Sequence, residues 1–266
     1  MTVILRQEFA TLWQDKDPFQ QVDAIQGKVY RELEGRRTLR FEQDGKPYFL
    51  KAHKGIGWKE ILKNLIQFRL PILGAINEKN AIEKLSSVGV GTMSMAAFGE
   101  RGNNPAQQES FIITDSIEPS VSLEELAIEW RSNPPSVHEK RQLLMKVCDM
   151  TRAMHEAGVN HRDFYICHFL LRDSSQENFP DLALIDLHRA LIHKKIPYRW
   201  LLKDLASIYY SAFDVPLTKR DKLRFIKNYS GGDLRKALVE DKTLWSQVEC
   251  KAHKLYQKAL RKGIVL

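Results

Sequence analysis

The sequence has few cysteines and no long apolar run. Cys148, Cys167 and Cys250 are widely spaced and form no C-x-x-C pair, so they indicate neither a disulfide framework nor a zinc site. The apolar stretch at the N-terminus is too short for a signal peptide, and no segment approaches the length needed to span a bilayer. Fixed-period repeats and low-complexity tracts are also absent. We therefore expect a globular protein of the reducing cytoplasm.

Acidic residues are outnumbered, with 33 Asp and Glu against 41 Lys and Arg, which gives a formal net charge of +8. Such an excess favours anionic partners, among them nucleotides, nucleic acid and phospholipid. No recognisable nucleic-acid module or aromatic and basic platform accompanies the charge, so we expect no nucleic acid as a partner. A length of 266 residues allows one large domain or two small lobes that share a cleft.

The first third of the chain has the pattern of strands. Two strand-like runs, residues 39–42 and 48–51, flank Asp44-Gly45, a strong hairpin signal that places Lys51 near the end of a strand in an antiparallel sheet. A helix is expected from Ala75 onward. The spacing of its apolar residues predicts that Glu78 lies on the apolar face of this helix. Because a carboxylate that faces the core usually has a cationic partner, we expect one for Glu78.

The second half is mainly helical in pattern, with two short apolar runs between the helices. One long helix is expected to bury Leu143, Val147, Met150 and Met154. A polar loop, residues 159–168, leads from it to the apolar run 169–171, and a second run, 182–185, ends in Asp186. Two short strands with an acidic residue at the mouth of each would place Asp163 and Asp186 in one cleft.

The loops carry a pattern that resembles a large enzyme family. His161-Arg162-Asp163, followed five positions after the aspartate by His168 and later by Asp186-Leu187-His188, resembles the catalytic and metal-binding loops of protein kinases. The ordered set of Lys51, Glu78, Asp163, Asp186 and Asp204 strengthens the likeness. The resemblance implies an α+β, two-lobed protein-kinase-like fold. Residues 1–117 would form an N-lobe of antiparallel sheet plus helix, and residues 118–266 a mainly helical C-lobe.

Longer motifs narrow the resemblance. Residues 31–41, 48–51, 161–169 and 186–190 resemble the lipopolysaccharide core heptose(I) kinases of Gram-negative bacteria. The resemblance implies ATP-dependent phosphorylation of the first heptose of the inner core, which contributes to core biosynthesis and outer-membrane integrity. It also implies the lipopolysaccharide core glycolipid as the substrate and partner.

The chemistry of phosphoryl transfer gives each candidate a role. The enzyme must hold ATP, neutralise the charge of its phosphates and accept the proton of a sugar hydroxyl. We expect Lys51 to hold the α- and β-phosphates and Glu78 to orient Lys51. Asp163 would accept the proton as the catalytic base. Asp186 would bind Mg²⁺, a hard cation that prefers carboxylate oxygen.

Other residues of the loops are expected to support these. By resemblance, Asp204 braces the catalytic loop through its backbone, and Arg162 anchors the loop. His168 stands where protein kinases have a metal-binding asparagine, so it either binds the metal or only shapes the loop. Gly27 is the single glycine where protein kinases have three, and it is a candidate phosphate contact. Cys167 beside His168 is rejected as a nucleophile pair because neighbours in an extended loop point apart.

Simpler explanations exist for each candidate. Asp163 and Asp186 could cap turns, Lys51 could be a solvated lysine at a strand end, and Glu78 could pair with a surface cation. At the level of function, one rival is a kinase for proteins or another small hydroxyl substrate, because the transfer machinery is common to all. A rival of another class is a pseudokinase or a basic binding module.

A basic amphipathic segment lies between the expected strand and helix. Its apolar residues are Trp58, Ile61, Leu62, Leu65 and Ile66, with Lys59, Lys63 and Arg69 outside that face. Such a helix could meet the lipid substrate or an anionic membrane surface, or it could pack onto the sheet. An acidic protein partner for the basic surface is not excluded. We expect the protein in the cytoplasm, at the inner face of the inner membrane.

Overall fold

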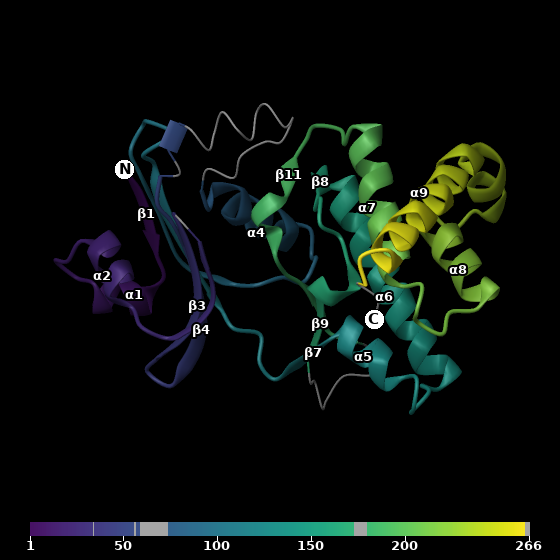
Figure 1. Cartoon of the computed structure of the whole chain (residues 1–266), viewed down its shortest axis with the longest axis horizontal. Helices are drawn as coiled ribbons and strands as arrows, with labels where there is room; N and C mark the ends of the chain where they lie inside the picture. Colours follow the sequence, from purple (N-terminus) through teal and green to yellow (C-terminus); the bar gives the residue numbers. More distant parts are fainter. Residues whose placement is uncertain (34, 56, 59–73, 173–179, 264–266) are drawn as a thin grey trace. The chain divides into compact units, whose positions relative to one another are not determined.

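The computed structural model describes residues 1–33, 35–55, 57–58, 74–172 and 180–263 (Figure 1). Its contacts divide the chain into two compact units. The first comprises Met1–Glu83 and Met93–Ser116, and the second comprises Lys84–Thr92 and Ile117–Leu266. The expected division into lobes at residues 117 and 118 stays a prediction.

The first unit is built on a six-stranded antiparallel sheet in the order β1-β5-β6-β4-β3-β2. Its strands are β1 (Thr2–Leu5), β2 (Lys28–Leu33), β3 (Arg36–Gln43), β4 (Lys46–His53), β5 (Met95–Arg101) and β6 (Glu109–Asp115). Asp44 and Gly45 form the turn between β3 and β4, with φ of 51° and 75°. Two positive φ angles are typical of the turn that joins a tight hairpin, so the expected hairpin is confirmed.

Two short helices and the sheet form the core of this unit. They are α1 (Gln7–Leu12) and α2 (Pro18–Ala24). Asp17 begins α2 by accepting the Phe19 amide at 2.9 Å, which satisfies one of the unpaired donors of the first turn. The buried cluster combines side chains of the helices with side chains of the strands: Phe9, Phe19, Val22, Leu39, Phe41, Tyr48, Leu50 and Phe111.

The helix expected after Ala75 is present as α4 (Ile76–Ser87). Glu78, Ile82 and Leu85 are all buried, as their shared face predicted. Most of the amphipathic segment expected before this helix lies outside the described residues. This applies to Lys59, Ile61, Leu62, Lys63, Leu65, Ile66 and Arg69. Only Trp58 of that prediction is described, and it is 55% exposed.

The second unit is mainly helical. Its helices are α5 (Leu123–Glu129), α6 (Val137–Glu156), α7 (Tyr198–Ser211), α8 (Lys219–Tyr229) and α9 (Lys242–Leu260). Two small antiparallel sheets accompany them. One has the order β10-β9-β7, from β10 (Leu182–Leu184), β9 (Phe169–Arg172) and β7 (Ser120–Ser122), and the other pairs β11 (Leu191–Ile192) with β8 (Val159–Asn160). The expected α+β fold is therefore confirmed.

Two helices of this unit can be compared with the sequence. In α6 the predicted face, Leu143, Val147, Met150 and Met154, is buried. Helix α7, which contains Asp204, begins at Tyr198, directly after Pro197 at its N-cap. Among the described residues, no helix is both long enough and apolar enough to cross a membrane.

Candidate active site

Strand β4 and helix α4 bring Lys51 and Glu78 together within the first unit. Lys51 Nζ lies 2.7 Å from Glu78 Oε1, and the two side chains are 15% and 1% exposed. The strand fixes Lys51 because it pairs with Thr38 on one side and Ile112 on the other. Glu78 therefore has the cationic partner that its buried position requires. The contact of Lys51 with ATP phosphates stays a prediction.

Gly27 lies immediately before β2, the outermost strand of the sheet. A Cβ atom at this position would overlap the carbonyl oxygen of Arg40, so only glycine allows the backbone to approach β3 so closely. This packing explains the glycine without a ligand. Its contact with phosphate stays a prediction.

In the second unit, Asp204 of α7 holds the loop that follows β8. Its Oδ2 accepts the amide of His161 at 2.7 Å and its Oδ1 accepts the amide of Arg162 at 2.9 Å. Asp204 has no exposed surface, and Arg162 takes a left-handed φ of 72°. A buried carboxylate that accepts two backbone amides is well satisfied, so the backbone next to Asp163 has a fixed course. This is the contact that the resemblance implies for Asp204.

His161 belongs to the interior of the same loop. Its ring is fully buried, and its Nε2 lies 2.9 Å from the carbonyl oxygen of Ile185. Because a carbonyl can only accept, Nε2 carries the proton. Burial lowers the pKa of His161, so the ring is neutral. It stacks on His168 at a centroid distance of 5.5 Å, and we assign it a structural role.

Asp163 lies among cations. Arg189 Nη1 is 3.1 and 2.9 Å from the two carboxylate oxygens, and Lys203 Nζ is 3.7 Å from Oδ1. Lys203 also donates to the carbonyl oxygen of Arg162. The side chain of Asp163 remains 20% exposed. The carboxylate is therefore held by two cations and still reaches the surface, and its role as the catalytic base stays a prediction.

Asp186 and His168 also lie close together. Asp186 has a left-handed φ of 61° after β10, and its Oδ1 is 2.7 Å from Nδ1 of His188. His168 Nδ1 is 2.7 Å from the carbonyl oxygen of Asp163, so Nδ1 carries the proton. The other ring nitrogen of His168, Nε2, lies 3.7 Å from Asp186 Oδ2.

The side chains of Asp186 and His168 fit a magnesium ion for which the phosphates of the nucleotide supply most of the ligands. Mg²⁺ is usually bound through one or two carboxylates together with substrate phosphates. Asp186 offers that carboxylate, and the hydrogen bonds of His168 and Asp186 orient the two side chains. Within the described ranges there is no group of three or more His, Cys, Asp or Glu that could hold a metal without a substrate.

A model of the lipopolysaccharide kinase (Kdo/WaaP) family matches residues 20–229. The chain belongs to this family. It is 51% identical over 268 residues to the lipopolysaccharide core heptose(I) kinase WaaP of Pseudomonas aeruginosa, and all of both chains is covered. It is 49% identical over 264 residues to the protein of the same name from Escherichia coli K12, covering 98% of this chain and all of the relative.

A solved structure described as WaaP in complex with acyl carrier protein has a TM-score of 0.84 to this chain. The two are 47% identical, and the match covers 96% of this chain and all of the other. The expected family and a kinase activity are thereby confirmed. Membership of a kinase family implies ATP as a substrate.

Sequence reasoning did not single out two of the residues beside Asp163. Arg189 occurs three positions after Asp186, and Lys203 directly precedes Asp204. Their closeness in sequence to Asp186 and Asp204 could have suggested a place in the site. However, a solvent-exposed arginine or lysine at these positions would give the same sequence pattern. Only the folded loop shows that both side chains converge on Asp163.

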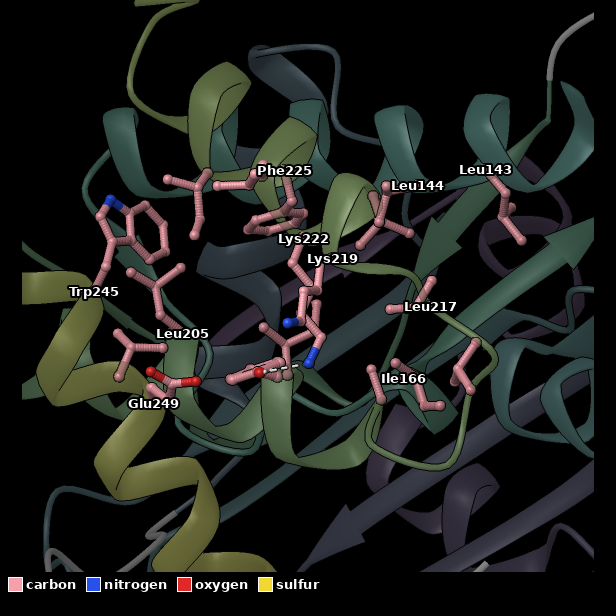
Figure 2. A pocket seen from close by; sticks show the side chains of 18 of the residues that line it. Leu143, Leu144, Ile166, Leu205, Leu217, Lys219, Lys222, Phe225, Trp245 and Glu249 are labelled. Carbon is pink, nitrogen blue, oxygen red and sulfur yellow. Dashed lines mark hydrogen bonds between the residues drawn. The ribbon is translucent and has the colours of Figure 1, made fainter. Parts of the chain in front are cut away.

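The second unit of this kinase also contains a large apolar pocket of about 630 Å³ (Figure 2). Helices α6, α7, α8 and α9 line it with side chains such as Leu143, Leu205, Phe225 and Trp245. Lysines from three helices also belong to its lining: Lys140, Lys219, Lys222 and Lys242. Its volume lies in the range of pockets that bind small ligands.

Proposed function

We propose that this kinase transfers the γ-phosphoryl group of ATP to the first heptose of the lipopolysaccharide inner core. One observation carries the proposal: in a member of the lipopolysaccharide kinase family, a partly exposed carboxylate, Asp163, follows a loop that Asp204 holds by two backbone amides. The curated relatives of similar length are called lipopolysaccharide core heptose(I) kinases. The product contributes to core biosynthesis.

In the proposed reaction, the residues of each unit have separate tasks. Lys51, oriented by the buried Glu78, binds the α- and β-phosphates. Asp186 would hold Mg²⁺, with His168 either as a second ligand or as a residue that shapes the loop, and the ion would neutralise phosphate charge. Asp163 receives the hydroxyl proton while the sugar oxygen forms its bond to the γ-phosphorus and ADP leaves.

We also propose that the enzyme works in the cytoplasm at the inner face of the inner membrane. The acceptor is a glycolipid, and the formal net charge of +8 favours an anionic lipid surface. Sedimentation with vesicles of phosphatidylglycerol and phosphatidylcholine tests this. Binding to the anionic vesicles that weakens with salt supports the proposal, and equal binding to purely zwitterionic vesicles contradicts the electrostatic part.

The activity is tested by transfer of labelled phosphate from ATP to core glycolipid from a strain that lacks this kinase. We expect wild type to label the heptose, and Asp163→Asn and Asp186→Asn to lose transfer while remaining folded. Asp149→Asn, which changes an exposed carboxylate on α6, should retain it. A wild-type protein that hydrolyses ATP but labels only an added protein would favour the rival kinase. Binding of ATP without any turnover would favour a pseudokinase.

A second proposal concerns a partner. The similar solved structure is described as WaaP in complex with acyl carrier protein. We propose that this chain also binds an acylated carrier protein and that the acyl chain enters the apolar pocket. The pocket lining is suited to a hydrocarbon chain, and Lys219 and Lys222 suit an acidic partner (Figure 2). Lys222 Nζ is oriented by the hydroxyl of Tyr209 at 2.8 Å.

Acyl-chain length provides the test of this partner. Each additional buried methylene contributes about 0.8 kcal/mol, so affinity should rise roughly fourfold per methylene until the pocket is full. Lys222→Glu should weaken binding of the carrier at every chain length. The control Lys254→Glu reverses an exposed charge on α9 that does not line this pocket. An affinity that does not depend on chain length would contradict the assignment of the pocket.

A further inference from the structure

Three cations surround the indole of Trp200 near the start of α7. The guanidinium carbons of Arg162 and Arg199 lie 4.8 and 5.0 Å from the ring centroid, and Lys203 Nζ lies 5.9 Å from it. Arg189 joins them through Asp163, which both Arg189 and Lys203 contact. We call Arg162, Arg189, Arg199 and Lys203 the Trp200 cation cluster. Cation–π attraction draws cations to the face of an indole ring. It can therefore hold these side chains close together despite the repulsion between their charges.

The cluster has too little negative charge around it. Asp163 and Asp204 are the carboxylates that act most strongly on Arg162 and Lys203. Asp204 already uses both oxygens to accept backbone amides. Burial and the neighbouring arginines lower the pKa of Arg162, and burial, with Arg189 as a further repulsive neighbour, lowers the pKa of Lys203. A group of like charges that disturb one another is stabilised when an anion joins it.

Arg162 shows most directly that a partner is needed. Its relative exposure is 8%, and its buried Nε atom has no hydrogen-bond partner among the residues that the structure describes. A buried arginine usually forms an ion pair or several hydrogen bonds, yet here its guanidinium stacks on Trp200. The unpartnered donor is a second observation, independent of the crowding of charge, that favours an anionic ligand.

Arg189 connects this cluster to the reacting group. Its Nη1 lies 3.1 and 2.9 Å from the two carboxylate oxygens of Asp163, and its side chain is 35% exposed. A guanidinium has five N–H donors in a planar fork, so it can hold a carboxylate on one edge and another oxyanion on the next. An anion bound there would lie beside the base that receives the acceptor's proton.

We propose that the Trp200 cation cluster binds an oxyanion of the acceptor glycolipid, a carboxylate or a phosphate close to the hydroxyl that is phosphorylated. This inference rests on the proposed function and names the feature by which the acceptor is oriented. The acceptor is favoured over ATP because two members of the cluster, Arg189 and Lys203, contact Asp163, the group assigned to the acceptor hydroxyl. Asp186 and His168 instead supply the atoms suited to a metal-bound nucleotide. Arg199, Lys203 and Arg189 then act as specificity-determining residues.

The test compares Arg199→Gln with wild type. Arg199 is exposed and has no contact with Asp163 among the described residues, so the folded loop should be retained. We expect the KM for glycolipid from a kinase-deficient strain to rise about tenfold, with kcat within about twofold and the KM for ATP unchanged. Arg199→Lys should restore part of the affinity because it keeps the charge. Arg152→Gln, a matched arginine on α6 that pairs with Glu156 at 2.7 Å, should leave all constants unchanged.

Two chemically modified acceptors identify the source of the oxyanion. In one, hydrogen fluoride removes the phosphates, and in the other, carbodiimide and borohydride convert the carboxyl groups to alcohols. If the bound group is a phosphate, wild type and Arg199→Gln should have the same KM for the dephosphorylated acceptor. If it is a carboxylate, they should have the same KM for the acceptor with reduced carboxyl groups. An equal tenfold difference on all acceptors, or a change confined to the KM for ATP, would overturn the proposal.

Binding without ATP separates this inference from the proposed function. Titration of the unmodified glycolipid should show about tenfold weaker binding to Arg199→Gln than to wild type, whether or not transfer is observed. Transfer to heptose with equal binding by both proteins overturns the role of the cluster and leaves the proposed function standing. Weaker binding without transfer to heptose supports the cluster and contradicts the proposed function.

Discussion

Lys51 Nζ lies 2.7 Å from Oε1 of Glu78, and the Glu78 side chain is only 1% exposed. The carboxylate is buried inside the first unit, whereas Lys51 keeps 15% of its side-chain surface. A buried charge of this kind is stable only when its partner stays in place. The pair therefore holds the ammonium in a fixed position from which it can meet an anion.

Glu78→Gln tests that arrangement. The amide keeps the shape but removes the charge that orients Lys51, so we expect kcat/KM for ATP to fall about tenfold to a hundredfold. The free energy of unfolding should fall by about 1 to 3 kcal/mol because a buried charged contact is lost. Glu83→Gln on the same helix is the control, since Glu83 is 50% exposed and pairs with Lys79. Equal activity of the two variants would argue against a role of the pair in binding ATP.

Asp204→Asn should disturb the catalytic loop. Both oxygens of Asp204 accept backbone amides, of His161 and Arg162, and an asparagine would present an NH₂ group to one of these donors. We expect a loss of about 2 to 3 kcal/mol in the free energy of unfolding and at least a tenfold fall in kcat. Denaturant unfolding and the transfer assay measure the two effects. A stable variant with normal kcat would show that the loop does not depend on this carboxylate.

The sequence was sufficient to predict the elements that repeat a simple pattern. The Asp44-Gly45 hairpin, the buried face of α4 with Glu78 and the long helix α6 are all present. In each, hydrophobic periodicity or a turn dipeptide dictates the local structure. The order of Lys51, Glu78, Asp163 and Asp186 likewise indicated a kinase, and the family match agrees.

Other features could not be predicted because they depend on distant parts of the chain. Helices α1 and α2 are only 6 and 7 residues long, too short for a clear period, and their aromatic residues are ordered by packing on the sheet. The cations around Trp200 and Asp163 come from residues as far apart as Arg162 and Lys203. Spacing along the chain does not reveal such convergence, because the loops must first be folded.

The three cysteines should differ in reactivity. Burial raises the pKa of the Cys148 thiol to about 12 and that of Cys167 to about 11, whereas Cys250 is exposed. At pH 8, Cys167 would be a thiolate in about one molecule in a thousand. We expect one thiol per folded chain to react rapidly with iodoacetamide, and Cys250→Ser to remove that phase. Rapid labelling of Cys167 instead would contradict its assignment as an inert neighbour of His168.

The stability of α8 should depend on pH through Asp221. This carboxylate is 5% exposed and lies 3.0 Å from Lys140 Nζ. Burial acts to raise its pKa, but hydrogen bonds from Thr218 and Lys140 outweigh burial and lower the pKa from 3.8 to about 2. Because the pKa in the folded state is the lower one, the stabilisation is complete well above pH 3.8 and is lost as the pH falls towards 2.

Asp221→Asn measures this contribution directly. At pH 6 we expect the variant to be less stable than wild type by about 2 kcal/mol, since Lys140 and the helix cap lose a charged partner. The difference should shrink as the pH falls from 4.5 to 3, where wild-type Asp221 begins to lose its advantage over the unfolded chain. Glu139→Gln, in the equivalent capping box of α6 at an exposed position, should cause a smaller change. A difference for Asp221→Asn that stays constant down to pH 3 would mean that the ionised carboxylate is not the source of the stabilisation, and that its shape and hydrogen bonds alone fix the start of α8.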